Sequence, residues 1–436
     1  MLRYSIRAGL CALCAAAVLA AQNEQGYNTN QRIQRIRELA KRDSNAIPAL
    51  GGYLKDPERD IRVEAVKAIV KLDGERSLEP LAQATHDQDS EVEIRATDGI
   101  VNCYLPGYVV KGGLTGPLTR GIRQVKTFFS SRNDQVIDPD VAIRPEVAQA
   151  LADEIGAAAN VDARANAARA AGILRDRTAV QALIQALHSK DNETLFEGLV
   201  ALQKIEDGSA AAGVLFLTHD LDDRIQAAAL ETVGVLHARE GAADVRSALS
   251  HARNDRVRRA ALEALAMLAI AEDRSIFQHY ASDQDVDLRA AALEGLGRLR
   301  EPADTPALDE AYNEKDADWK VHLAAAFALV DEGKLGTEEF SPLRYLVEAL
   351  DVTARAHTAQ PYLAELAKRQ EVRRALIPLV ANATRDQKVA LCAVFSTTHS
   401  DDVIPVLNTL AKDIDPEVSM AAARGLRIVQ ARRTPS

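Results

Sequence analysis

Two stretches of the chain decide the fold. Residues 254–265 read NDRVRRAALEAL, and residues 287–297 read DLRAAALEGLG. Each opens with polar side chains and continues with Arg, Ala and Leu at helical spacing, which predicts the start of an amphipathic helix. The same register returns about every 31 residues, with one interruption. Its positions are Ile61, Val92, Ala163, Thr194, Ile225, Val257, Leu288 and Trp319.

A fixed repeat of this length predicts a solenoid built from helical pairs. Apolar residues such as Val180, Leu183 and Leu187 mark a first helix, and a small residue four places past the register lets second helices approach closely. An Asp, Asn or Glu three places before the register is the expected N-cap of the second helix. These residues are Glu58, Asp89, Asn160, Asp191, Asp222, Asn254, Asp285 and Asp316, together with Asp415 before a fainter copy of the register at Val418. We predict an all-α, right-handed α-α superhelix of about 10–11 helical pairs.

The quoted motifs resemble HEAT repeats, and specifically the short HEAT-like repeats of the phycobilisome-lyase type. The resemblance covers residues 46–100 and 146–330 well, and residues 340–430 loosely. It implies a HEAT-type solenoid whose second helices line the concave face. It implies little about function, because such repeats serve as scaffolds, as chaperones and occasionally as enzymes.

The composition supports a folded helical protein. The 436 residues are 47% hydrophobic and only 4% aromatic, so Ala and aliphatic side chains supply the core. The net charge of −10 argues against a nucleic-acid partner, which needs a basic surface.

Residues 1–21 have the pattern of a secretory signal peptide. Arg3 and Arg7 precede an apolar run over residues 8–20 that is too short to span a bilayer comfortably. We expect cleavage after Ala20 or Ala21 and a periplasmic or secreted product, with an uncleaved anchor and lipidation as the alternatives. Only Cys103 and Cys392 follow this segment, and their separation in an elongated array argues against an intrachain disulfide.

The period divides the rest of the chain. We expect a disordered linker over 22–30, an N-terminal cap and two repeats over 31–100, and a Gly/Pro-rich insertion over 101–145. Central repeats follow over 146–330, then an irregular join over 331–345 and divergent repeats over 346–430. Insertions in solenoids map to loops on one face, which is often the binding face.

The insertion is locally basic. Residues 99–133 contain no acidic side chain, and residues 117–130 predict a basic amphipathic helix. This helix either packs on the acidic solenoid or recognises a partner or an anionic membrane surface through 114–130. Its candidate binding residues are Lys111, Arg120, Arg123, Lys126, Phe128 and Phe129.

We find no motif that carries catalysis. The sequence has no phosphate-binding Gly-rich loop, no nucleophile elbow and no His-Glu-x-x-His pair. None of the nine histidines precedes a Glu, which argues against the repeated His-Glu pairs of the HEAT-like deoxyhypusine hydroxylases. An acidic chain with one Trp does not suit the HEAT-like DNA glycosylases. A bilin-lyase-like activity stays open, although the resemblance assigns it no residue here.

Two columns of polar residues recur with the repeat. His86, His188, His219 and His251 all lie six places before the register, where they either cap first helices or form a pH-sensitive ladder, with metal binding as a third reading. Six places past the register, Glu231, Glu263 and Glu294 follow one another on second helices. They form either a solvated helix face or an acidic docking groove for a basic or amphipathic segment.

We therefore expect a non-enzymatic, exported scaffold that binds a protein or peptide partner on the solenoid surface. The alternatives are a bilin-lyase-like HEAT-repeat enzyme and a membrane-surface adaptor. We expect no catalytic residue, no cofactor, no metal and no nucleic-acid partner.

Overall fold

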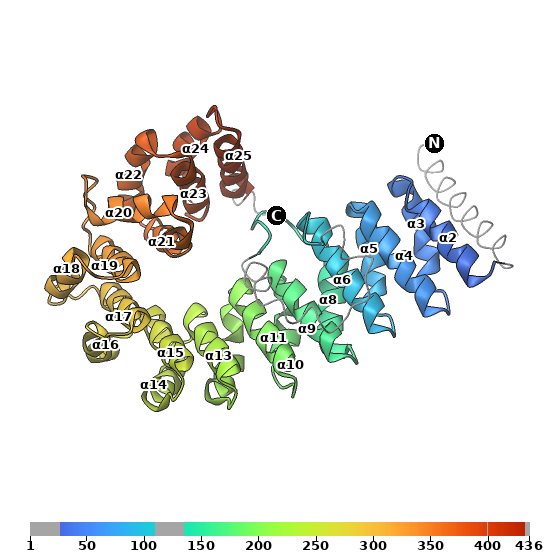
Figure 1. Ribbon diagram of the computed structural model, residues 1–436, viewed down its shortest axis with the longest axis horizontal. Coiled ribbons are helices and arrows are strands. Elements are labelled where there is room, and N and C mark those ends of the chain that lie inside the picture. The colour runs from blue at the N-terminus through green and yellow to red at the C-terminus, as the bar shows by residue number, and fades with distance from the viewer. Residues whose placement is uncertain (1–26, 110–134, 399, 432–436) are drawn as a thin grey trace, which may run out of the picture. The chain divides into compact units, whose positions relative to one another are not determined.

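Helices make up all the regular structure in the part of the chain that is described. The computed structural model describes residues 27–109, 135–398 and 400–431, and these ranges contain 23 α-helices and no strand (Figure 1). The described helices follow one another as eleven pairs after α2, the first described helix. The predicted all-α solenoid is therefore confirmed, and the number of pairs agrees with the period.

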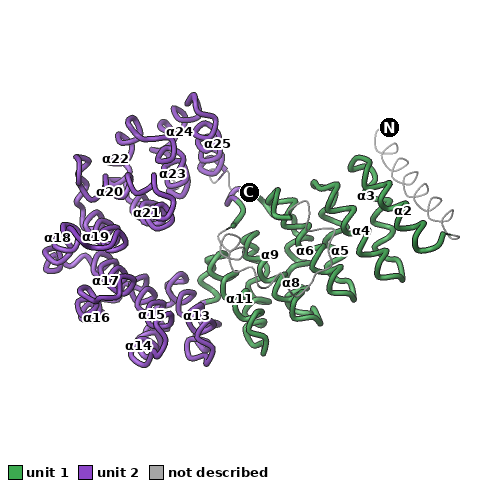
Figure 2. Tube along the Cα trace, viewed as in Figure 1, with its two compact units in different colours: residues 1–137, 141–210 green, residues 138–140, 211–436 purple. Residues whose placement is uncertain are grey.

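The chain divides into two compact units (Figure 2). Unit 1 comprises residues 1–137 and 141–210, and unit 2 comprises residues 138–140 and 211–436. Helix α2 (Thr29–Leu39) opens the described part of unit 1. Its pairs are α3 (Ile47–Tyr53) with α4 (Arg59–Leu72), α5 (Leu78–Ala84) with α6 (Ser90–Tyr104), α8 (Pro145–Ala157) with α9 (Val161–Ile173), and α10 (Val180–Ala186) with α11 (Asn192–Ile205).

The described part of unit 2 contains seven pairs. The first four are α12 (Ala211–Val214) with α13 (Asp223–Val235), α14 (Ala242–His251) with α15 (Asp255–Leu268), α16 (Arg274–Tyr280) with α17 (Val286–Leu299), and α18 (Thr305–Asn313) with α19 (Trp319–Asp331). The last three are α20 (Pro342–Glu348) with α21 (Thr353–Leu366), α22 (Gln370–Leu379) with α23 (Arg385–Ser396), and α24 (Ile404–Leu410) with α25 (Pro416–Ala431). Within this unit α13, α15, α17 and α19 lie side by side in one row. Helices α14, α16 and α18 form a second row that packs against α15, α17 and α19.

Most of the predicted N-caps are observed. Seven of the predicted side chains accept hydrogen bonds from amides at the start of their helices: Asp89, Asn160, Asp191, Asp222, Asn254, Asp285 and Asp415. Glu58 occupies the N-cap of α4 without a side-chain bond. The prediction of Asp316 is wrong, because a turn closed by Ala317 N and Glu314 O delays the helix and makes Asp318 the N-cap of α19.

Small side chains allow the second helices to pack closely. A Cβ added to Gly172 would lie 2.7 Å from the Ala201 Cα, and one added to Gly234 would lie 3.0 Å from the Ala264 Cα. The buried residues of both units are mostly Ala, Leu, Val and Ile, as the composition predicts. Cys103 and Cys392 are both free.

Candidate functional site

Three glutamates from consecutive second helices come together in unit 2. Glu231 lies on α13, Glu263 on α15 and Glu294 on α17. The carboxylates of Glu294 and Glu231 both act electrostatically on that of Glu263, so the structure brings together the three residues of the predicted column. We call these three residues the acidic stripe.

Glu263 is the central member of the acidic stripe. Its side chain is exposed to solvent at the surface. The packed helices around its carboxyl group reduce its hydration, and this effect, followed by the carboxylates of Glu294 and Glu231, raises its pKa to about 7. Lys320 on α19 acts in the opposite direction, although its ammonium pairs with Asp287 at 2.5 Å. The carboxylates around Glu263 therefore raise its pKa more than the neighbouring cation lowers it.

Glu294 is held inside the protein. The Tyr362 hydroxyl on α21 donates to Glu294 Oε2 at 2.6 Å, and Arg298 pairs with the same carboxylate. Arg298 also donates to both oxygens of Glu365 at 3.1 and 2.8 Å. Only 14% of the Glu294 side chain is exposed, so it is the buried end member of the acidic stripe. The side chains of Glu231 and Glu263 are exposed to solvent.

The sequence patterns did not indicate the partners of Glu294. Tyr362 and Glu365 lie 68 and 67 residues from the groups they bind, in the part of the chain where the repeats are least regular. Tyr362 also stacks on Phe327, with ring centroids 4.5 Å apart. No local spacing signals contacts of this kind, since they depend on how α21 packs against α17 and α19.

Described contacts are known for two of the four histidines of the predicted ladder. All four side chains are exposed. His219 Nε2 lies 3.1 Å from Asp244 Oδ1, and His251 Nδ1 lies 2.9 Å from the Ser247 carbonyl oxygen near the end of α14. The contact of His251 fits the capping interpretation. The described ranges hold no group of three or more His, Cys, Asp or Glu side chains suited to a metal ion.

The basic candidates lie outside the described residues. They are Lys111, Arg120, Arg123, Lys126, Phe128 and Phe129, all within 110–134. The predicted helix over 117–130 therefore stays a prediction.

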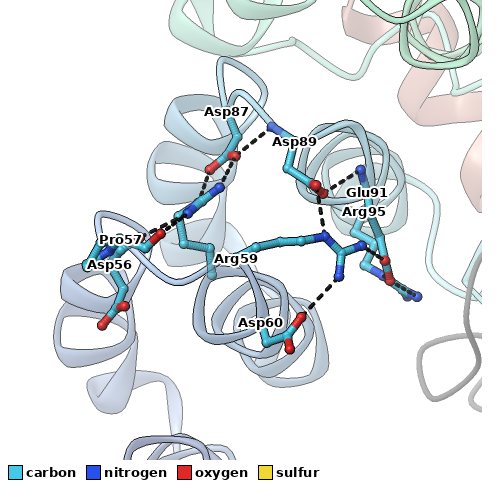
Figure 3. A network of polar contacts seen from close by, with 9 residues as sticks. Asp56, Pro57, Arg59, Asp60, Asp87, Asp89, Glu91 and Arg95 are labelled. Carbon is cyan, nitrogen blue, oxygen red and sulfur yellow. Dashed lines mark hydrogen bonds and ion pairs between the residues drawn. The ribbon is translucent and has the colours of Figure 1, made fainter. Parts of the chain in front are cut away.

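Ion pairs join neighbouring repeats in unit 1 (Figure 3). Arg62 on α4 donates to both oxygens of Asp87 at 2.7 and 2.9 Å. Arg59 donates to Asp89 at 2.8 Å and also pairs with Glu91. The carboxylates in the turn between α5 and α6 are thus held by arginines of the preceding repeat.

A cavity of about 390 Å³ lies beside this turn. Its walls include the turn before α6, the first part of α6 and the last part of α8. Its polar lining includes His86, Asp87, Asp89, Glu93, Asp153 and Glu154. Burial, followed by the carboxylates of Asp87 and Asp89, raises the pKa of Glu93 to about 7.

Two parts of the chain match a known type of helical repeat. Residues 16–100 and 242–330 match the family model described as HEAT repeats. A search of curated protein sequences finds no match. In the described ranges, no helix has both the length and the apolar character needed to cross a membrane.

Solved structures of similar fold include proteins of different kinds. The phycocyanin lyase complex of CpcE and CpcF from Nostoc sp. PCC7120 is 20% identical over 62% of this chain and 92% of that chain, with a TM-score of 0.37. Importin beta is 13% identical over 95% of this chain and 67% of that chain, with a TM-score of 0.39. Human deoxyhypusine hydroxylase is 18% identical over 58% of this chain and 96% of that chain, with a TM-score of 0.28. At these identities and TM-scores the likenesses say nothing about what this chain binds or does.

Proposed function

On this solenoid with HEAT repeats, we propose that the protein is a binding scaffold for a protein or peptide partner. The partner carries a basic segment, which docks on the acidic stripe of unit 2. The observation that supports this proposal is Glu263, an exposed carboxylate whose pKa is raised to about 7 in its crowded surroundings and beside two further carboxylates.

A basic segment would relieve this repulsion. A Lys or Arg side chain near Glu263 favours the ionised carboxylate, so binding would lower its pKa and release a proton near neutral pH. The acidic stripe also attracts a cationic segment before contact, which raises the association rate at low ionic strength.

Charge reversal tests the proposal. A fluorescent octa-lysine peptide is titrated into the full chain and into the double variant E231K/E263K, with fluorescence anisotropy as the readout. We expect binding at least tenfold weaker in the variant, and an affinity of the original protein that falls steeply with added salt. Glu294 stays unchanged, because its contacts with Arg298 and Tyr362 make it structural.

The matched control is E301K/E310K. It makes the same change in net charge at two exposed positions outside the acidic stripe. An equal loss of affinity in both double variants would mean that only the net charge matters, and would overturn the proposal.

We also propose that the scaffold is exported and not an enzyme. The support is the signal-peptide pattern of residues 1–21 and the lack of a catalytic motif in the sequence. Cell fractionation and the N-terminal sequence of the mature protein test export. Copurification with a chromophore would favour the bilin-lyase-like alternative instead, and membrane binding through 114–130 stays a prediction testable with anionic liposomes.

A further inference from the structure

A hydrogen-bond donor recurs at one position of the second helices. Four residues after the N-cap, a side chain turns back to a backbone carbonyl at the end of the preceding helix or in the turn that follows it. Arg62, for example, donates to the carbonyl oxygens of Asp56 and Pro57 at 3.0 and 3.2 Å. Six second helices have this contact, through Arg62, Arg164, Gln226, Arg258, Arg289 and His322. The position is thus built to receive a donor, most often a guanidinium.

Helix α6 breaks this pattern with a carboxylate. Four residues after its N-cap Asp89 lies Glu93, which accepts hydrogen bonds and cannot donate them when ionised. Glu93 is 8% exposed, and its side chain makes no hydrogen bond or ion pair with any described residue. The turn residues Asp87 and Gln88, which correspond to the Asp56 and Pro57 acceptors of Arg62, line the cavity beside it.

Helix α8 breaks a second pattern in the same place. Four residues before the C-cap, five other first helices place a buried apolar side chain: Leu50 in α3, Leu81 in α5, Leu183 in α10, Phe277 in α16 and Leu407 in α24. In α18 the corresponding residue is Glu310, which is exposed to solvent. In α8 this residue is Glu154, which is 2% exposed. Its Oε2 accepts from the Thr97 hydroxyl at 2.7 Å, whereas its buried Oε1 has no hydrogen-bond partner among the described residues.

Glu93 and Glu154 line the same cavity. The arginines of the preceding repeat are paired with other carboxylates. Arg62 and Arg59 hold Asp87 and Asp89. Asp153, the other acidic residue on α8 there, is exposed and accepts from Gln149 at 2.7 Å. The carboxylate of Glu93 itself contributes to raising the pKa of Glu154, after the larger effect of burial. Two buried carboxylates without a cation are costly, and a cation in the cavity offsets that cost.

We propose that this cavity binds the guanidinium group of an arginine side chain from a partner protein. The inference deepens the proposed function, since it names a residue that the partner would insert into unit 1. The partner's arginine would occupy the place that Arg62 and its counterparts fill in other repeats. It would donate to Glu93, to the free Oε1 of Glu154 and to the carbonyls of Asp87 and Gln88.

The chemistry favours guanidinium over other cations. Its planar fork carries five donors and matches two carboxylates and neighbouring carbonyls at once, whereas an ammonium has three donors on a single nitrogen. Guanidinium is also weakly hydrated, so its transfer into a mostly buried site costs less. A bound cation would favour the ionised forms of Glu154 and Glu93, so that binding releases protons.

The test uses a small probe and the full chain. N-acetyl-arginine amide is titrated against protein labelled at the alanine methyl groups, and the shifts of Ala157 and Ala158 in the cavity wall are followed by NMR. N-acetyl-citrulline amide, which has the same shape without the charge, is the ligand control. We expect saturable shifts with arginine, and binding at least tenfold weaker with citrulline and for the E93Q and E154Q variants.

A second variant keeps the test sound if those substitutions disturb folding. E93R restores the arginine of the other repeats, so it should fill the cavity, abolish probe binding and raise the melting temperature. The matched control is E79R, the same change at an exposed residue of α5 away from the cavity, which should leave probe binding unchanged.

Three outcomes would overturn the inference. They are equal binding of arginine and citrulline, unchanged binding by E93R, and at least tenfold tighter probe binding after Arg120, Arg123 and Arg132 are replaced by Gln. The last would show that the chain fills its own cavity. None of them depends on the acidic stripe, so failure here leaves the octa-lysine experiment to decide the proposed function.

Discussion

At the scale of single residues, Glu93 makes the stability of unit 1 depend on pH. Its pKa rises from the ordinary 4.5 to about 7 in the folded protein, first because of burial and then because of Asp87 and Asp89. Below about pH 4.5 the carboxyl group is protonated in both states and costs nothing. Between pH 4.5 and 7 the unfolded chain ionises first, so the free energy of unfolding falls by at most about 3 kcal/mol.

The variant E93Q should remove this dependence. We expect it to unfold with nearly the same free energy as the original protein at pH 4.5, and to be more stable by about 2 kcal/mol at pH 8. Urea denaturation at the two pH values measures the difference. A gap that is equal at both values would show that Glu93 ionises normally in the folded protein.

At the scale of helices, the contact between α17 and α19 depends on the absence of a side chain. A Cβ added to Gly297 would lie 2.5 Å from the Ala328 Cα, so G297A must push the two helices apart. The overpacking exceeds the gain in helix propensity, and we expect a loss of about 2 kcal/mol in the free energy of unfolding. The matched control is G156A in α8, where no atom lies within 4 Å of the added Cβ and a gain of about 0.5–1 kcal/mol is expected. Destabilisation by both variants would point to a backbone requirement in place of close packing.

The helix scale also shows what the sequence could predict. The repeat period identified the second helices and the column of Glu231 and Glu263, because both follow from local spacing. It misplaced the start of α19, where a turn shifts the N-cap to Asp318. The contacts of α21 with Glu294 were out of reach, since they join residues far apart in the sequence. The exceptional residue Glu93 could have been found from the sequence, because it occupies the repeat position at which most other repeats have Arg62 or its counterparts.

At the scale of the whole molecule, each repeat of a solenoid contacts chiefly its neighbours, so damage in one unit should stay there. The Arg62–Asp87 pair joins two repeats of unit 1, with only 6% and 9% of the two side chains exposed. R62A would leave Asp87 buried without its cation, at a cost of about 3 kcal/mol. We expect faster hydrogen exchange throughout α3–α6, and unchanged exchange in α14–α19 of unit 2.

The control for R62A is R37A, which removes an arginine that is 65% exposed and paired with Glu64 at 2.7 Å. Exposed pairs contribute less than about 1 kcal/mol, so exchange in α3–α6 should barely change. Hydrogen exchange followed by mass spectrometry measures both variants in one experiment. If R62A accelerates exchange equally in both units, the chain unfolds as a single cooperative body. A partner bound to unit 1 would then stabilise unit 2 as well, whereas local damage would mean that the arginine cavity and the acidic stripe act as independent binding sites.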